Sequence, residues 1–297
     1  MRRRFIDIGA NLTDLMFQGI YHGKQVHPPD IESVLERSIK IGIEKIMITG
    51  GCLEDCQKAL ELAKTDDRLF TTVGVHPTRA LELETDTQSR IDELVEICLN
   101  NRKKVVAVGE FGLDYDRTNF CSKNIQLKNF ARQFELVERT KLPLFLHCRN
   151  SCEDFIKIIQ SNRDKFKHGV VHSFDGTFDE ARSILDLDLF IGLNGCSLKT
   201  SENLDVVRRL PIDRLMIETD CPYCDVRPTH ASHQYVRTKN EAVKKEKWAD
   251  GKMIKGRNEP CNIVQILEIL SKLFEIDEDS LAETFYENSC RIFFQSI

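Results

Sequence analysis

The sequence predicts a (β/α)8 barrel, and three observations support this fold class. Eight short apolar runs recur along the chain, and each precedes a segment with helical spacing, which is the βα alternation of a parallel sheet. Eight such units in 297 residues suit a barrel better than an open sheet. A doubly wound open sheet would favour a glycine-rich nucleotide turn after its first strand, and the pair Gly50-Gly51 is too weak a signal to indicate one.

The strands are expected where β-branched and apolar residues cluster, as in the buried strands of a parallel sheet. The clearest run is Val105–Val108, which ends abruptly in Gly109-Glu110. The eight expected strands are Phe5–Gly9, Lys45–Gly50, Leu69–Val75, Val105–Glu110, Leu142–His147, Gly169–Phe174, Leu189–Gly195 and Leu215–Asp220.

The segments between these runs carry apolar residues three and four positions apart, which is the spacing of an amphipathic helix. In the first of them, Ile31, Val34, Leu35 and Ile39 share one face. The expected helices are Asp30–Ile41, Leu53–Ala63, Ser89–Leu99, Gln126–Thr140, Ser151–Gln160, Phe178–Leu185 and Asn203–Arg209.

The pattern changes after the eighth strand. Residues 223–260 contain no clear strand, and their middle is rich in lysine, so we expect a long, partly helical loop within one barrel domain that spans residues 1–297. The lysines either line a DNA groove or form a solvated surface, which is the commoner case. Trp248 and Tyr235 either stack on bases or anchor the loop. Helices at Asn262–Phe274 and Ser280–Phe293 close the chain.

Composition excludes some classes of protein. A formal net charge of −5 argues against a nonspecific basic coat for nucleic acid. No run of about 18 apolar residues occurs, so we expect no membrane span. Eleven cysteines without a regular framework, and a start that lacks a secretory signal, predict reduced thiols in an intracellular protein.

Polar side chains close several of the expected strands, and the functional groups of a barrel lie at the carboxyl ends of its strands. Glu110 directly follows a buried strand, where an ionised carboxylate is costly unless a metal or a base compensates its charge. Three other strands end in residues that could supply a partner, namely His147, His172 and Asp220. We therefore expect these four side chains to meet around divalent metal. The other polar strand ends are Asp7 with Asn11, Thr49, His76 and Asn194.

Histidine and carboxylate ligands without cysteine suit Mg²⁺, Mn²⁺ or Zn²⁺, and oxygen-rich sets favour Mg²⁺ or Mn²⁺. One or two ions are expected, and a two-metal site activates water for phosphodiester cleavage. Each residue also has a plainer interpretation, because a single histidine at a strand end is more often structural and a single acid can cap the next helix. Four such residues on four strands are harder to explain in that way.

The chain carries eight motifs in a fixed order, FIDIGANLTD, GVHP, VVAVGEFGLD, LPLFLHCR, VVHSFDGT, IGLNG, LMIETDCP and RNEP. Together they resemble the motifs of the TatD-family metal-dependent deoxyribonucleases, from Phe5 to about Phe294. The resemblance implies a barrel of the amidohydrolase type, DNA hydrolysis that depends on divalent cations, and a place in the nucleus or the cytoplasm. It assigns the metal positions of the family to Glu110, His147, His172 and Asp220.

Two motifs depart from the pattern of many relatives. Where these have His-x-His after the first strand, this chain has Asp7 to Asn11, so one metal lacks two imidazoles. Where they have His-Pro-His after the third strand, this chain reads His76-Pro77-Thr78. The TatD branch proper is similar to this chain in the first departure.

We expect Glu110 and Asp220 to act in catalysis, with Asp220 helping to deprotonate water, and His76, Arg149 and Asn11 to contact the substrate. Arg149 either forks onto a phosphate or pairs with a neighbouring carboxylate, and Arg257 has the same two interpretations.

The run from Cys221 to Cys224 mimics a redox CxxC motif but lacks a thioredoxin-like context, so a redox function is disfavoured. Cys148 and Cys152 are expected to be core or helix-face thiols.

The leading hypothesis is a monomeric deoxyribonuclease with DNA as its partner and no membrane association. A small-molecule amidohydrolase on the same barrel is the second, although such enzymes often carry a carbamylated lysine where this chain has Glu110. A non-enzymatic metal-binding scaffold is the third, because of the missing histidine pair.

Overall fold

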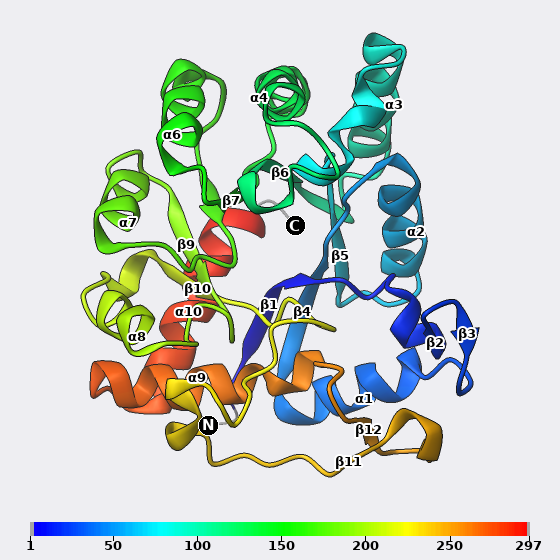
Figure 1. Ribbon diagram of the computed structural model, residues 1–297, viewed down its shortest axis with the longest axis vertical. Helices are drawn as coiled ribbons and strands as arrows, with labels where there is room; N and C mark the ends of the chain where they lie inside the picture. The colour runs from blue at the N-terminus through cyan, green and yellow to red at the C-terminus, as the bar shows by residue number, and fades with distance from the viewer. Residues whose placement is uncertain (1–2, 296–297) are drawn as a thin grey trace.

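The computed structural model describes residues 3–295 and contains one eight-stranded sheet in which neighbouring strands are parallel. The strand order follows the chain, as a barrel requires, and the helices lie around the strands (Figure 1). The strands are β1 Phe5–Ala10, β4 Ile43–Ile48, β5 Leu69–Val73, β6 Val105–Asp114, β7 Leu144–Arg149, β8 Gly169–Val171, β9 Phe190–Leu193 and β10 Leu215–Ile217.

The first and last strands meet and nearly close the sheet. An isolated parallel bridge joins Ala10 to Cys221, the Asn11 amide donates to the Cys221 carbonyl at 2.7 Å, and the Asp220 amide donates to the Gly9 carbonyl at 2.8 Å. The predicted (β/α)8 barrel is therefore confirmed. Its closure places the segment after β1 directly against the segment after β10.

The helices agree with the apolar spacing except in one region. The predicted helix Gln126–Thr140 is two helices, which meet at Gln133, whose side chain bonds both the amide and the carbonyl of Val75. The helix α7 is fixed at its start by a capping box between Thr177 and Glu180. The helices are α1 Ile31–Ile41, α2 Leu53–Lys64, α3 Thr87–Asn100, α4 Lys123–Arg132, α5 Phe134–Thr140, α6 Cys152–Ser161, α7 Phe178–Leu185, α8 Ser201–Val207, α9 Ile263–Phe274 and α10 Glu278–Phe293.

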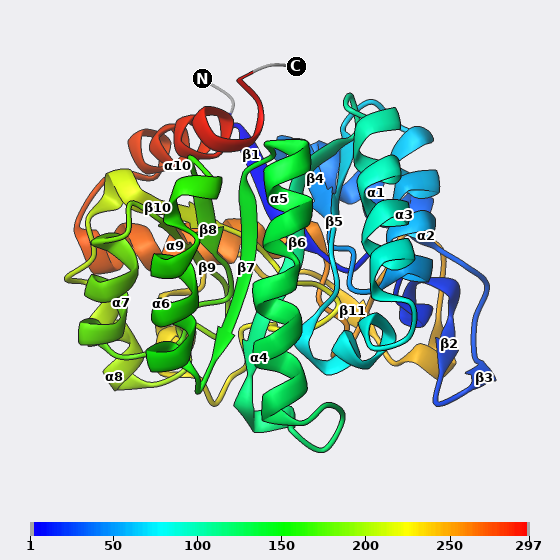
Figure 2. The ribbon, with the colours of Figure 1, turned by 90° about the horizontal axis from the view of Figure 1, so that it is seen from above.

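The barrel interior is filled by a cluster of buried apolar side chains to which every one of the eight strands contributes. The end of α10 joins this cluster, and the Phe294 ring packs edge-on against Phe70 with 4.9 Å between the ring centroids. In Figure 2, α10 lies across one end of the strands. This end is sealed by apolar packing, so polar groups gather at the carboxyl ends of the strands. A larger apolar cluster fills the layer between strands and helices.

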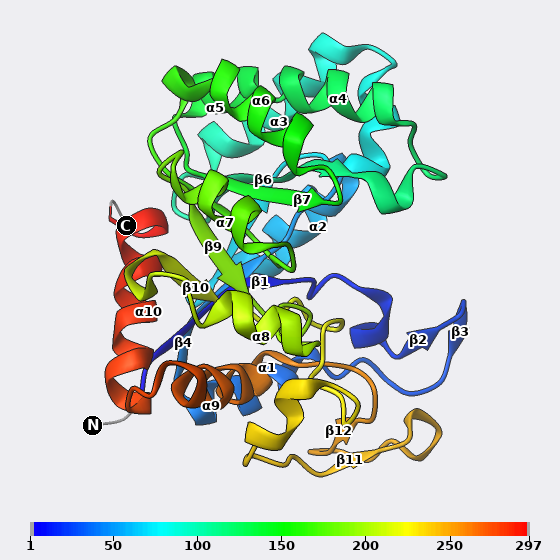
Figure 3. The ribbon, with the colours of Figure 1, turned by 60° about the vertical axis from the view of Figure 1, so that its left-hand side comes forward.

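The long segment after β10 has more structure than the sequence predicted. It contains a pair of two-residue strands that the sequence did not reveal, β11 Ala242–Val243 and β12 Met253–Ile254 (Figure 3). Trp248 stacks on the His27 ring with 5.9 Å between centroids, and the Lys245 ammonium lies 4.6 Å from the centroid of the Tyr21 ring. Trp248 therefore anchors this segment. No helix within residues 3–295 is long and apolar enough to cross a membrane.

Candidate metal centre

The centre is built on β6, which runs four residues further than predicted and carries two acids, Glu110 and Asp114. Val108 pairs with Leu144 and Phe111 pairs with Leu146, so β6 has one residue more than β7 between these two pairs. The pairing therefore contains a β-bulge at Gly109-Glu110. Bulges re-aim a side chain, and this one directs Glu110 toward the histidines. Gly109 has a φ of 151°, and a Cβ there would lie 2.1 Å from a β7 carbonyl oxygen, so the bulge requires glycine.

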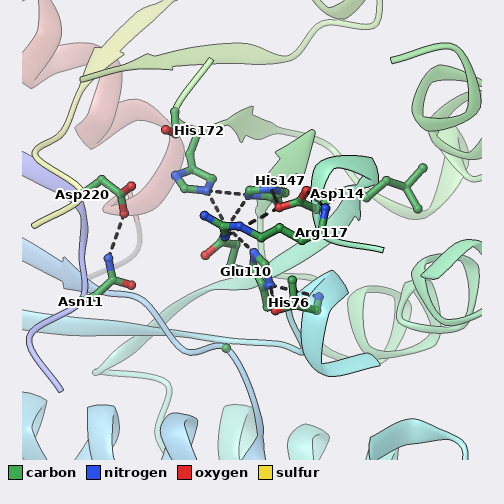
Figure 4. A network of polar contacts seen from close by, with 12 residues as sticks. Asn11, His76, Glu110, Asp114, Arg117, His147, His172 and Asp220 are labelled. Carbon is green, nitrogen blue, oxygen red and sulfur yellow. Dashed lines mark hydrogen bonds and ion pairs between the residues drawn. The ribbon is translucent and has the colours of Figure 1, made fainter. Parts of the chain in front are cut away.

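One carboxylate oxygen lies at the middle of the centre (Figure 4). Glu110 Oε1 is 2.7 Å from His147 Nδ1, 2.7 Å from His172 Nε2 and 3.4 Å from His76 Nε2. The three imidazoles come from β7 and from the segments that follow β8 and β5. The ligand atoms of Glu110, His147 and His172 all lie within 4.8 Å of one another, so the three residues could hold a metal ion.

His147 also belongs to a second group. Its Nε2 atom is 3.2 Å from Asp114 Oδ2, and the rings of His147 and His76 meet edge to face with 4.7 Å between centroids. His76, Asp114 and His147 form a second set with ligand atoms within 4.8 Å. Each set therefore faces a different nitrogen of His147. This arrangement provides two adjacent positions for an ion.

Asp114 had no role in the sequence analysis, because the strand was expected to end at Glu110. The signal that could have revealed it is the continued alternation of Phe111 and Leu113, both fully buried, beyond Glu110. Asp114 Oδ1 also accepts hydrogen bonds from the amides of Asp116 and Arg117, each at 3.1 Å.

The surrounding imidazoles favour the ionised form of Glu110. Burial raises the pKa of Glu110, but the charges and hydrogen bonds of the surrounding histidines outweigh it and hold this pKa well below its ordinary value. Burial lowers the pKa of His172, yet the charges of Glu110 and Glu218 hold it well above its ordinary value. His76 differs, since burial lowers its pKa to about 4.

Thr78, which stands where many relatives have a second histidine, fixes the ring of His76. The Thr78 amide donates to His76 Nδ1 at 3.2 Å, and the Thr78 hydroxyl lies 2.7 Å from the same nitrogen. The Nε2 atom of His76 thus faces Glu110.

A second layer of residues orients His172. Its Nδ1 atom lies 3.4 Å from Glu218 Oε1, and its ring stacks on Phe145 with 4.6 Å between centroids. Glu218 is fully buried and accepts hydrogen bonds from the Ser173 amide at 2.6 Å and the Asn194 side chain at 3.1 Å. A carboxylate behind a histidine is the usual support of a metal ligand. The sequence showed Glu218 only as the first letter of the motif ETD.

Asp220 lies apart from these two sets (Figure 4). Its Oδ1 atom accepts a hydrogen bond from the Asn11 side chain at 2.8 Å, and its Oδ2 atom accepts one from the Cys224 thiol at 3.3 Å. Within residues 3–295 it belongs to neither set of potential metal ligands. Burial raises its pKa to about 6, although the charge of His172 opposes this shift. The structure thus brings three of the four expected ligands together and places the fourth, Asp220, outside both sets.

Asp7, in the position of the missing histidine pair, supports the closure of the barrel. It is fully buried, its Oδ1 accepts from the Thr219 amide at 2.9 Å, and its Oδ2 lies 2.6 Å from the Thr219 hydroxyl. Burial raises its pKa to about 8. Asp7 and Asn11 therefore hold the segment that carries Asp220.

The two arginines with open interpretations differ. Arg149 lies at the mouth, where its Nε donates to Asp116 at 2.9 Å, and it lines a cavity of about 550 Å³ together with Phe174, Phe178 and Arg209. Arg257 is buried, with two bonds of 2.7 Å to Asp30 and one of 3.0 Å to Glu259. Arg257 therefore forms a buried structural ion pair and is not available to bind a phosphate.

Comparisons with known proteins agree with this architecture. The family model described as TatD related DNase matches residues 6–294. The chain is 45% identical to the protein named deoxyribonuclease Tat-D of Schizosaccharomyces pombe, over 97% of this chain and 95% of that protein. It is 33% identical to the 3'-5' ssDNA/RNA exonuclease TatD of Erwinia tasmaniensis, over 97% and 98% of the two chains. The crystal structure of a TatD family hydrolase from Entamoeba histolytica is 42% identical, covers 100% of both chains and superposes with a TM-score of 0.95.

Proposed function

Because this chain belongs to the TatD related DNase family, we propose that it is a deoxyribonuclease that hydrolyses DNA phosphodiester bonds with the help of divalent metal. The observation that carries the proposal is the position of Glu110 Oε1, which lies within 3.4 Å of three imidazole nitrogens, one from β7 and two from the segments that follow β8 and β5. A carboxylate and imidazoles that converge in this way are a donor set for a divalent cation.

The residues present fit one or two ions. Glu110, His147 and His172 would hold one, and His76, Asp114 and His147 would hold the other. Their mixture of nitrogen and oxygen donors is compatible with Mn²⁺ and Zn²⁺ as well as Mg²⁺. Asp220 remains a proposed ligand, and to reach an ion it would exchange its bond to Asn11 or to Cys224.

A bound divalent ion would acidify water and withdraw charge from the phosphate that is cleaved. Among the residues of the chain, Asp220 would accept the proton of the attacking water while Asn11 orients its carboxylate. His76 accepts the Thr78 amide on Nδ1, so its Nε2 is the atom that would bind the second ion. When only the ion at Glu110, His147 and His172 is bound, the neutral imidazole of His76 would instead carry a proton on Nε2 and donate it in a hydrogen bond to a phosphate oxygen.

Arg149 would contact the substrate backbone next to this centre. It lies directly after His147-Cys148 at the end of β7 and can exchange its exposed bond to Asp116 for a phosphate. The cavity that it lines has a volume of about 550 Å³, which suits a nucleotide that flanks the scissile bond.

The test is a cleavage assay on metal-free protein with end-labelled single-stranded DNA, double-stranded DNA and single-stranded RNA of one sequence. Mg²⁺, Mn²⁺ and Zn²⁺ are added back separately, and the RNA strand is included because the name of the Erwinia relative covers both nucleic acids. We expect cleavage of DNA only when metal is present. Turnover of cyclic amides or esters without DNA cleavage would support the amidohydrolase alternative, and no turnover of any substrate would support a scaffold.

A further inference from the structure

Two cysteines that are distant in sequence lie in contact beside Asp220. Cys196 follows β9, Cys224 follows β10, and their sulfur atoms are 2.7 Å apart. This separation is shorter than an ordinary non-bonded contact of about 3.5 Å. Both residues are partly exposed, so a small oxidant can reach them.

The backbone brings these two loops together. A Cβ at Gly195 would lie 2.1 Å from the carbonyl oxygen of Cys224, so the approach of the loops requires a residue without a side chain at position 195. Cys224 itself adopts a left-handed conformation with a φ of 51°. The proximity of the two thiols therefore follows from the path of the main chain and does not depend on side-chain rotation alone.

We propose that Cys196 and Cys224 form a reversible disulfide at the mouth of the metal centre. A disulfide needs sulfur atoms about 2.0 Å apart, which a small movement of the two side chains achieves. With a peroxide as the oxidant, two S–H bonds and one O–O bond break, one S–S bond forms, and one hydrogen peroxide becomes two waters. A dithiol reverses the reaction by exchange, and it is itself oxidised to a disulfide.

Oxidation would act on Asp220, and this part of the inference rests on the proposed function. The Cys224 thiol donates a hydrogen bond to Asp220 Oδ2 at 3.3 Å, whereas a disulfide has no hydrogen to donate. Loss of a residue that orients a metal ligand typically costs about 10–100-fold in metal affinity or activity. We therefore expect oxidation to lower the cleavage rate about 10-fold and a dithiol to restore it.

Peptide mapping tests the disulfide directly. The metal-free full-length protein is treated with hydrogen peroxide, its remaining thiols are alkylated, and it is digested with trypsin without reduction. We expect a cross-link between peptides 183–199 and 215–237, with fragment ions that place it on Cys224 and not on Cys221. Cys196→Ser should lack this species. Absence of the cross-link from the oxidised wild type would overturn the proposal.

Activity assays test the consequence. Cys196→Ser keeps the Cys224 thiol, so its cleavage rate should equal that of the reduced wild type and should not change on oxidation. Cys152→Ser removes a different thiol near the centre, so its cleavage rate should still fall on oxidation, as in the wild type. A cross-linked wild type that cleaves DNA at its full rate would refute the effect on Asp220. Reduced protein that cleaves no DNA would refute the proposed function instead, while the mapping would still decide whether the disulfide forms.

Discussion

Replacement of Glu110 by glutamine changes the centre with little change in shape. Glutamine keeps the size of the side chain and an oxygen that can accept a hydrogen bond, but it removes the negative charge that lies 2.7 Å from His147 and His172. Because Glu110 is one of three ligands in its set, we expect the cleavage rate to fall at least about 1000-fold, which corresponds to about 4 kcal/mol of transition-state stabilisation.

The same substitution should remove stabilisation of the fold by metal. An ion at 100 times its dissociation constant stabilises a folded protein by about 2.7 kcal/mol. For a chain of 297 residues this raises the melting temperature by about 5 °C. The Glu110→Gln variant should lose the part of this shift that comes from the ion at Glu110, His147 and His172. Without metal it should lose about 1–3 kcal/mol, since the buried imidazoles lose their charged partner.

The assay combines cleavage of end-labelled DNA with thermal unfolding, each with and without metal. Glu153→Gln is the matched control, because Glu153 lies on α6 with a side chain that is 86% exposed and should contribute less than about 1 kcal/mol. If Glu110→Gln cleaves DNA as fast as the wild type and keeps the full metal shift, the assignment of Glu110 as the central ligand is wrong.

Three further predictions concern groups around the centre. Asp220→Asn should abolish cleavage and leave the fold intact, and full activity in this variant and in Glu110→Gln together would refute the site. Burial raises the pKa of Asp7 from 3.8 to about 8, so the folded state keeps a proton that the unfolded chain releases, and wild-type stability should fall by about 1.4 kcal/mol per pH unit between pH 5 and 8 from this group. Asp7→Asn has no carboxyl group to titrate at this position, so the free energy of unfolding of this variant relative to the wild type should increase up to pH 8 and then level off. The measurement is urea unfolding in EDTA across this pH range, and a difference in unfolding free energy that does not change with pH would contradict the burial argument. Arg257→Met leaves the buried Asp30 carboxylate without its charged partner, while Glu259 keeps its ion pair with Arg37. The substitution should cost about 3–5 kcal/mol of unfolding free energy, and a loss below 1 kcal/mol would show that the ion pair contributes little.

The fold could be predicted because apolar periodicity reports burial directly. Runs such as Val105–Val108 are buried on both faces, and the helical spacing that follows each run shows which side packs on the sheet. The two-residue strands β11 and β12 escaped prediction, because so short a pair shows no periodicity and is held by tertiary contacts such as that of Trp248 with His27.

The sequence by itself determined the barrel, its strand order and the position of His147, His172 and Asp220 near the carboxyl ends of their strands. These features depend on local burial and on the direction of parallel strands, both of which can be read from residue types. Glu110 was expected at the end of its strand, but it lies within β6, four residues before that strand ends.

Only the tertiary structure decided which of these side chains meet. The bulge in β6 sets the direction of Glu110, and the extension of that strand brings Asp114 to His147. Asp220 is held by Asn11 and Cys224, which lie on separate segments joined by barrel closure. Distances of a few ångströms between strand ends depend on register and loop path, and residue types along one strand carry no information about either.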